Sequence, residues 1–587
     1  MKKTPRAVAV ILLLCLLCSP FAGAEHFPAT SHPQISFEEM GEGTYDYADF
    51  QALLAEFSTA AQRANAAEEV RELTARLIAE IDVVETQYAL AELYYYLEVD
   101  NTERQQHQEA MRSIVQDVWD EALLALSIAL EGPNEQTVVE ALGGHEIAYD
   151  FYGYEPLTER MREFSKQEND LIQNYYSLTA EALSDADYVA AVGPIFIQLR
   201  DLRINMAEEY GYDNYAEMTS LHTYDREYGV RDIIRFCHNV RDDLVDAFFS
   251  VYDLYTSATE RKLNSVPEYT QEQLVELLGR HIGTLSSELE EAYLHMARHG
   301  LYDISPSGSK AEIGFTTPLP QHGTAFIYDS PVDSTVQNFS TLVHEFGHFC
   351  AEHFNAEPTL LRLNDYDLFE MHSQGLEVLF FPFYDDIYGD SAEAVLQLQL
   401  EDFLYNIIYC SYLAELELSI YQNPDWSLDD INRHSAQLLE AYRLSFSDQP
   451  LESDTDWLYT DHLITSPLYI ISYPVSGVAV LELWRLSLSD HAAAVETYLS
   501  LMASGTSETF LDTLDTLGMQ DVFAAQSTRA IAAAVYGYFD TTPDDSGRNY
   551  MVLGYLIAAA ATFLILFSLW RRRARRYYEE ASEPSLL

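Results

Sequence analysis

The residues best suited to chemistry in this 587-residue chain are His344, Glu345 and His348, which form an H-E-x-x-H sequence in an apolar run. Two histidines four residues apart on a helix project from one face, at a separation that a single tetrahedral Zn²⁺ can bridge. Glu345 lies one position round the helix, where its carboxylate can accept a proton from an attacking water without binding the metal. Hydrolysis of an amide bond needs this combination. A helix with two surface histidines is the alternative interpretation.

A third metal ligand has to come from another part of the chain. The metzincin pattern H-E-x-x-H-x-x-G-x-x-H is excluded, because Ala351 and Phe354 stand at its glycine and third histidine positions. Glu370 and Glu377, in the sequence E-M-H-S-Q-G-L-E, are seven residues apart and would share one face of a second helix. Apolar residues flank them, so both carboxylates would face a core in which a metal could offset their charge. A solvated acidic face is the alternative.

Together these motifs resemble those of the zinc peptidases of the oligoendopeptidase F and thimet oligopeptidase family, which are gluzincins. The resemblance implies that His344, His348 and Glu370 bind one Zn²⁺ per chain. It also implies that Glu345 is the general base, and that Glu377 orients a ligand histidine from outside the metal's own ligand set.

A third segment, from His462 through Tyr469 to Tyr473, resembles the histidine- and tyrosine-containing segment that closes over the scissile bond in the same family. The oxyanion that develops during hydrolysis needs a hydrogen-bond donor, which a phenol or an imidazole can supply. The resemblance implies this role for His462 and Tyr473. Tyr469 lies four residues before Tyr473 and could share a face with it. Packing is the alternative for each tyrosine, since the chain has 41 of them.

Two β-rich runs precede the motif helix, at residues 313–317 and 324–328. They predict a hairpin or small sheet beside the metal site. An edge strand there could pair with the backbone of an extended peptide, and the family places a glycine-containing strand just before its motif helix. We therefore expect the substrate to bind at Gly323, Thr324, Ala325 and Phe326. An ordinary structural hairpin is the alternative.

Both ends of the chain carry membrane-related signals. Basic residues at positions 2, 3 and 6 precede an apolar run, and a small-residue cleavage site ends at residue 24, as in a secretory signal peptide. Residues 551–570 carry no charge and are long enough to cross a bilayer, and five arginines follow them. The positive-inside rule keeps those arginines cytoplasmic. We expect a single-pass cell-membrane protein with its catalytic part outside the cytoplasm. A buried core helix is the alternative for residues 551–570.

The chain is strongly acidic, with 94 acidic and 33 basic residues and a net charge of −61. Such a surface repels nucleic acid and anionic headgroups, so nucleic acid is excluded as a partner of the ectodomain. The charge suits cationic peptides, or it simply maintains solubility. Beyond residue 24 cysteine occurs only at positions 237, 350 and 410, an odd number that argues against a disulfide framework.

Helical periodicity predicts a mainly α-helical fold, with helices in the regions 45–99, 171–206, 230–255 and 271–299 before the hairpin. In the first region Leu73, Leu77, Ile81 and Val84 recur at three- and four-residue steps. The resemblance implies a two-lobed helical zinc-peptidase ectodomain around a channel, with a small β-sheet near the active site. One C-terminal transmembrane helix completes the expected fold class. The predicted divisions are a signal peptide (1–24), a helical N-terminal lobe (25–300), a catalytic lobe (301–540), a juxtamembrane linker (541–550), a transmembrane helix (551–570) and a basic cytoplasmic tail (571–587).

The predicted activity is zinc-dependent hydrolysis of internal bonds in short peptides. Oligopeptides are the expected substrates and partners, because a deep cleft admits extended chains and excludes folded proteins. Two alternatives stay open. One is a peptidyl-dipeptidase of the same family, and the other is a surface protein that binds peptides and has lost the chemistry.

Overall fold

The structure, a computed structural model, describes residues 34–154, 158–179, 183–311, 313–332, 334–355, 357–362, 365–445, 454–504 and 508–542. It is mainly helical, as the sequence predicts. The helices before the sheet are α2 (Phe37–Met40), α3 (Tyr47–Ala61), α4 (Ala67–Leu97), α5 (Thr102–Leu130), α6 (Glu135–Ala141), α7 (His145–Ala148), α8 (Glu159–Thr179), α9 (Asp185–Glu209), α10 (Tyr215–His222), α11 (Val230–Tyr252), α12 (Ser257–Leu263), α13 (Gln271–Leu285) and α14 (Ser287–His299).

The helices after the sheet include the two that carry the metal-site motifs. They are α15 (Thr335–Phe354), α16 (Tyr366–Phe380), α17 (Tyr384–Tyr388), α18 (Ala392–Gln422), α19 (Leu428–Ala441), α20 (Asp461–Thr465), α21 (Ser472–Ser489), α22 (His491–Ala503), α23 (Phe510–Thr516) and α24 (Ala525–Phe539). Short 3-10 turns include η2 (Pro320–His322), which precedes α15, and η3 (Thr359–Leu361), which lies between α15 and α16.

The predicted hairpin is present as part of a three-stranded sheet. Its strands are β1 (Tyr302–Asp303), β2 (Gly314–Leu319) and β3 (Thr324–Asp329), in the order β1-β3-β2. β3 pairs with β1 in parallel and with β2 in antiparallel orientation, with Thr316 opposite Ile327. All six residues of β3 are buried. β3 is therefore the central strand and β2 an edge.

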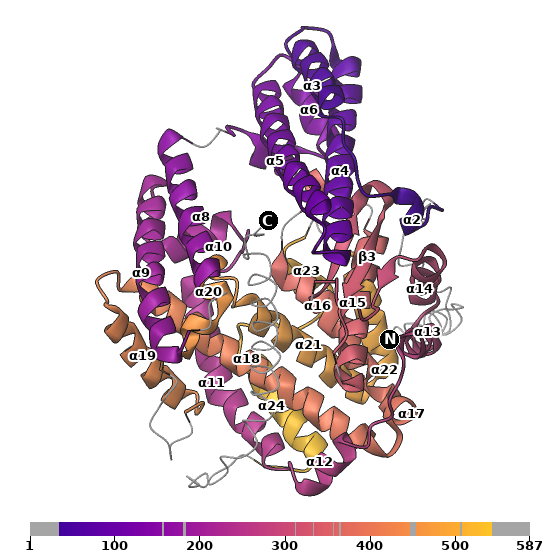
Figure 1. Ribbon diagram of the computed structural model, residues 1–587, viewed down its shortest axis with the longest axis vertical. Helices are drawn as coiled ribbons and strands as arrows, with labels where there is room; N and C mark the ends of the chain where they lie inside the picture. Colours follow the sequence, from indigo (N-terminus) through magenta and orange to yellow (C-terminus); the bar gives the residue numbers. More distant parts are fainter. Residues whose placement is uncertain are drawn as a thin grey trace, which may run out of the picture.

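The first helices have an apolar core of their own. Residues of α3, α4, α5 and α6 bury a cluster that includes Phe50, Phe57, Leu77 and Leu126, and Leu360 of η3 is also part of it. Figure 1 shows these helices, in indigo, at the top of the molecule. The regular spacing of Leu73, Leu77, Ile81 and Val84 that predicted a helix corresponds to the buried face of α4.

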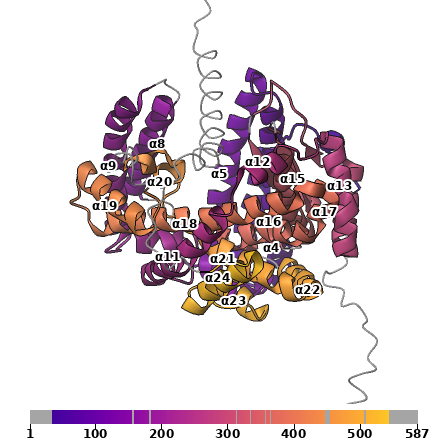
Figure 2. The same ribbon diagram turned by 90° about the horizontal axis from the view of Figure 1, so that it is seen from below.

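A larger core contains buried residues from Ala89 to Val535. In Figures 1 and 2, α8, α9, α19 and α20 form one group of helices, and α13, α15, α16 and α17 form another. α18 contacts α19 in the first group and α17 in the second, so it connects them. Each group and the common core draw on residues from both sides of position 300. The predicted boundary between two lobes at that position stays a prediction.

The fold class expected from the sequence needs one correction, which concerns the membrane. Among the described residues no helix is both long and apolar enough to cross a bilayer. The predicted transmembrane helix and the single-pass location at a cell membrane are therefore withdrawn. The segments on which these predictions were based, residues 1–24 and 551–587, lie outside the described residues. Most of the predicted linker at 541–550 also lies outside them.

Candidate active site

Two helices that cross at a glycine build the centre of the site. The Ser334 side chain caps α15 by accepting a hydrogen bond from the Gln337 backbone N–H, and the Asp365 side chain caps α16. A Cβ on Gly347 of α15 would lie 2.7 Å from both the carbonyl oxygen of His372 and the Cα of Ser373 on α16. Both are backbone atoms, so only glycine lets the two helices approach this closely.

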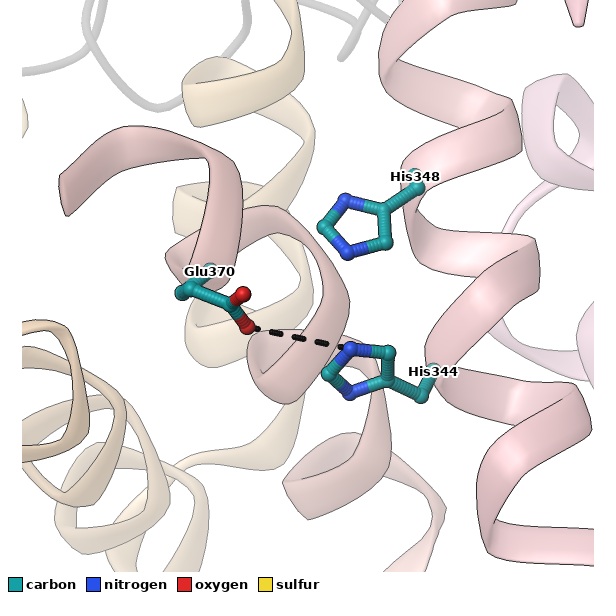
Figure 3. A group of neighbouring side chains, drawn as sticks. All are labelled: His344, His348 and Glu370. Atoms are coloured by element: carbon teal, nitrogen blue, oxygen red, sulfur yellow. Dashed lines mark ion pairs between the residues drawn. The ribbon is translucent and has the colours of Figure 1, made fainter. Parts of the chain in front are cut away.

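This crossing brings together the three residues predicted to bind a metal. Ligand atoms of His344, His348 and Glu370 all lie within 4.8 Å of one another. Figure 3 shows both imidazoles projecting from α15 toward the carboxylate of Glu370 on α16. The Nε2 atom of His344 is 3.7 Å from Oε2 of Glu370, and the two rings are nearly perpendicular. Two imidazole nitrogens and one carboxylate oxygen form a donor set that suits Zn²⁺ and leaves a further position open.

Glu377 lies next to His344, on the side of the ring away from Glu370. Its Oε1 is 2.9 Å from Nδ1 of His344, and the hydroxyl of Ser340 donates to its Oε2 at 2.7 Å. With Nδ1 engaged in this way, Nε2 of His344 is the atom that faces Glu370. This is the arrangement in which a carboxylate fixes the orientation and tautomer of a metal-binding histidine.

The charges and pKa shifts of His344, His348 and Glu370 are compatible with a bound cation. Burial opposes protonation of His344, but the hydrogen bond with Glu377 and the charges of Glu377, Glu370 and Glu345 outweigh it and raise its pKa to about 10. Burial and the neighbouring charge of His344 hold the pKa of His348 well below its usual range. Burial also raises the pKa of Glu370. A divalent cation would offset the carboxylates that, without it, attract a proton to His344.

Glu345, the predicted general base, is 6% exposed. The hydroxyl of Thr316 on β2 is 2.7 Å from Oε2 of Glu345 and 2.9 Å from its backbone oxygen. Burial raises the pKa of Glu345 to about 7, although the charge of His344 and the hydrogen bond with Thr316 oppose this. The sequence predicted the strand that contains Thr316. It did not predict that Thr316 contacts Glu345 on α15.

His462, Tyr469 and Tyr473 lie together: His462 is in the first turn of α20, Tyr469 is in the loop that follows, and Tyr473 is in the first turn of α21. The rings of His462 and Tyr469 stack with centroids 5.3 Å apart, and the Tyr473 ring lies 5.3 Å from that of Tyr469. The Tyr473 hydroxyl is 3.4 Å from Nε2 of His462. Burial raises the pKa of both tyrosines, and the charge of Glu370 contributes to each shift. This aromatic group therefore lies within electrostatic range of Glu370. The roles predicted for its members stay predictions.

The predicted substrate strand needs a correction. Gly323 has φ of +56° and ends the η2 turn, and Thr324, Ala325 and Phe326 belong to the central strand β3, where each is at most 2% exposed. They are therefore not available to pair with a peptide. Both β-rich runs have the same local pattern, and the order of the strands depends on β1, a strand of two residues that no local pattern reveals. The edge next to α15 is β2.

No known family model matches this sequence, and no curated protein matches it. Solved structures do. A protein assigned as oligoendopeptidase F aligns with a TM-score of 0.71 and 18% identity, over 87% of this chain and 99% of that one. PZ peptidase A, solved with an inhibitor, gives a TM-score of 0.66 and 18% identity, over 87% of this chain and all of that one. The M32 carboxypeptidase from Deinococcus radiodurans R1 gives a TM-score of 0.57 and 13% identity, over 79% and 99%.

At such low identity a likeness between structures establishes the fold. The sequence motifs point independently to the same family, and the alignments extend over most of this chain and nearly all of each partner. The chain therefore has the helical peptidase fold of the solved oligoendopeptidase F structures, the fold of the family that its motifs resemble.

Proposed function

We propose that this protein is a zinc-dependent oligopeptidase that hydrolyses internal bonds of short peptides. The observation that carries the proposal is the convergence of His344, His348 and Glu370 within 4.8 Å, with Glu345 buried at the same crossing. The peptidase fold supports it, because each of the three solved structures compared above is that of a protein named as a peptidase. The higher TM-score of the oligoendopeptidase F structure favours the endopeptidase over a carboxypeptidase.

Each residue of the site has a defined task in this mechanism. His344, His348 and Glu370 would hold the zinc, and Glu377 keeps His344 oriented through Nδ1. When bound, zinc supplies Lewis acidity, which makes water more acidic and a peptide carbonyl more electrophilic. Glu345 accepts the proton of the attacking water and delivers it to the departing amine. A pKa near 7 suits both steps at neutral pH.

Groups around this centre would position the peptide. Thr316 donates to Oε2 of Glu345, which leaves Oε1 of that carboxylate to take the proton. The hydroxyl of Tyr473 and the imidazole of His462 donate hydrogen bonds to the carbonyl oxygen as it gains negative charge. The unpaired side of β2 offers backbone groups to an extended peptide, and Thr316 connects this strand to Glu345.

The first prediction concerns Glu345→Gln, which keeps the shape of the side chain and removes its basicity. We expect kcat to fall about 10²- to 10⁴-fold while one zinc per chain remains bound. Cleavage is measured on internally quenched peptides by mass spectrometry, before and after removal of metal by a chelator and after addition of zinc. The matched control is Glu352→Gln on the same helix, which alters only the ion pair with Arg362 and is expected to keep kcat.

The products separate the alternatives. Fragments from internal bonds support the endopeptidase, and successive dipeptides from the carboxyl end identify a peptidyl-dipeptidase. Peptide binding without products identifies a binding protein. Activity that survives both Glu345→Gln and metal removal contradicts the proposed mechanism.

A further inference from the structure

The loop of residues 466–471, between α20 and α21, holds one residue in a strained backbone conformation. Leu468 has φ of +64°, in the left-handed region that residues other than glycine rarely adopt. Its side chain is buried, with 2% of its surface exposed. Tyr469 follows it directly, and Tyr473 is the second residue of α21. The conformation of Leu468 therefore helps to set the position of Tyr469, whose ring packs edge-on against Tyr366 of α16, the helix that carries Glu370, with ring centroids 5.2 Å apart.

Two ionisable side chains from distant parts of the chain hold Leu468 by its backbone. The Leu468 N–H donates to Oε1 of Glu417 on α18 at 2.8 Å. The Arg226 guanidinium, between α10 and α11, donates from Nη1 to the Leu468 carbonyl oxygen at 2.9 Å. Its Nη2 donates to the hydroxyl of Ser472, also at 2.9 Å. A strained residue persists only where its surroundings determine it, and here both backbone polar groups are held by buried ionisable side chains.

Arg226 is placed for this contact by its own surroundings. It is 5% exposed and lies between the rings of Tyr224 and Tyr228, with its central carbon 4.4 and 5.8 Å from their centroids. The Tyr224 hydroxyl donates to the carbonyl oxygen of Pro467 in the same loop. The Tyr228 hydroxyl donates to Asp367, three residues before Glu370 on α16. The same group of side chains thus contacts both the tyrosine-bearing loop and the helix that carries Glu370.

We infer that Arg226 is a positioning residue of the active site. By bridging the Leu468 carbonyl and the Ser472 hydroxyl, it holds the loop of residues 466–471 and, with it, the positions of Tyr469 and Tyr473 beside α16. Because its guanidinium donates to the loop and to the start of α21, Arg226 acts on the site through the tyrosines. This inference rests on the proposed function, because it concerns groups assigned there to the substrate carbonyl.

The two contacts require the forked geometry of a guanidinium. One nitrogen reaches the residue before Tyr469 and the other reaches the residue before Tyr473, so the same group fixes both ends of the segment that bears them. The compact ammonium of a lysine has one centre and cannot span two such acceptors in the same way. Arg226→Lys is therefore expected to retain part of the effect, and Arg226→Met none of it.

The test measures kcat, KM, zinc affinity and backbone hydrogen exchange in full-length Arg226→Met. We expect kcat to fall about 10- to 100-fold, as for a small displacement of groups that act in the transition state, with KM changed less than threefold. Zinc affinity is expected to stay the same, since its ligands are untouched. Exchange is expected to accelerate in residues 461–473 and to remain slow in α15 and α16.

Arg200→Met is the matched control. Arg200 is also a buried arginine, 4% exposed, and its Nη1 donates to a backbone carbonyl of another loop, that of Trp426. It is expected to lose stability and keep kcat. Glu417→Gln retains an oxygen acceptor for the Leu468 N–H and is expected to behave like the wild type, whereas Glu417→Met is expected to reproduce the lowered kcat.

The outcomes distinguish a failure of this inference from a failure of the proposed function. Loss of kcat in Arg226→Met with an intermediate Arg226→Lys supports it, and so does exchange that accelerates only around the loop. It is overturned if Arg226→Met keeps kcat within twofold, if Arg200→Met loses as much, or if exchange accelerates throughout the protein. If Arg226→Met does not fold, Arg226→Lys and Glu417→Met decide by the same measurements. If the wild type cleaves no peptide, the proposed function fails, while the exchange data still show whether Arg226 holds the loop.

Discussion

The carboxylate of Glu345 is oriented by the side-chain hydroxyl of Thr316. Thr316 lies on β2, a strand that precedes the motif by about thirty residues and contacts α15 from the sheet. The sequence predicted the three candidate ligands and the base because their types and spacing are specific to this chemistry. It could not predict Thr316, because threonine is common in strands and only the pairing of β2 with β3 decides which side chain faces the helix.

Thr316→Val removes this hydroxyl and keeps the size and β-branching of the side chain. We expect kcat to fall about tenfold, because a hydrogen bond to a charged group is worth about 1.5–3 kcal/mol and part of that is lost when the carboxylate is free to turn. KM is expected to change little. Steady-state kinetics with the same quenched peptides provide the measurement.

Thr316→Ser is the control for this change. It retains the hydroxyl and loses only a methyl group, so its kcat is expected to stay within about threefold of the wild type. Equal losses in the two variants would mean that Thr316 acts by packing and that its hydrogen bond with Glu345 is irrelevant to the rate.

At the scale of elements, the site depends on how closely α15 and α16 approach. Both helices were expected from the spacing of the motif residues that they carry. Their crossing at Gly347 was not, since the sequence shows a glycine in a helix but not which backbone lies against it. The same limit explains the error over β3: two runs with similar patterns cannot be ordered without their long-range partners. Strand ends and helix crossings are set by tertiary contacts that periodicity does not contain.

Gly347→Ala is expected to separate the two helices. Its Cβ would meet backbone atoms of His372 and Ser373, which cannot rotate away. Helix α16 must therefore shift, and Glu370 moves away from the two histidines. We expect a loss of stability of about 1–3 kcal/mol, as for other overpacked sites, together with weaker zinc binding. Urea unfolding and zinc titration with a competing chelator measure the two effects.

Gly537→Ala provides the comparison, because this glycine also lies in a helix, α24, but has nothing within 4 Å of an added Cβ. It is expected to be neutral or to stabilise the protein by up to about 1 kcal/mol. Unchanged zinc affinity in Gly347→Ala would show that the helices do not need this approach to form the site.

At the scale of the whole molecule, charge is the property that composition alone predicts. The net charge is −61, so acidic side chains repel one another. This repulsion is stronger in the folded state, because the acidic residues are closer together there than in the unfolded chain. The acidic surface was evident from the sequence. The arrangement of the helix groups was not, because α8 and α9 lie beside α19 and α20, which are more than two hundred residues away along the chain.

Folding stability is therefore expected to rise with ionic strength. The Debye length falls from about 10 Å at 0.1 M salt to about 3 Å at 1 M, so repulsion across the surface is screened. Urea unfolding at increasing sodium chloride concentration measures this, and the free energy of unfolding is expected to increase until screening is complete. A free energy that stays constant or decreases would mean that attractive pairs outweigh the net repulsion.

The crossing of α15 and α16 also connects metal occupancy to the persistence of the fold. A cation shared by His344, His348 and Glu370 would join two consecutive helices and close a chain segment of some twenty residues, much as a covalent cross-link does. Release of the ion and separation of the two helices are then thermodynamically linked. At low zinc concentration the folded state loses the stabilisation that the ion provides. A chelator that removes zinc would therefore destabilise the fold, as a denaturant does.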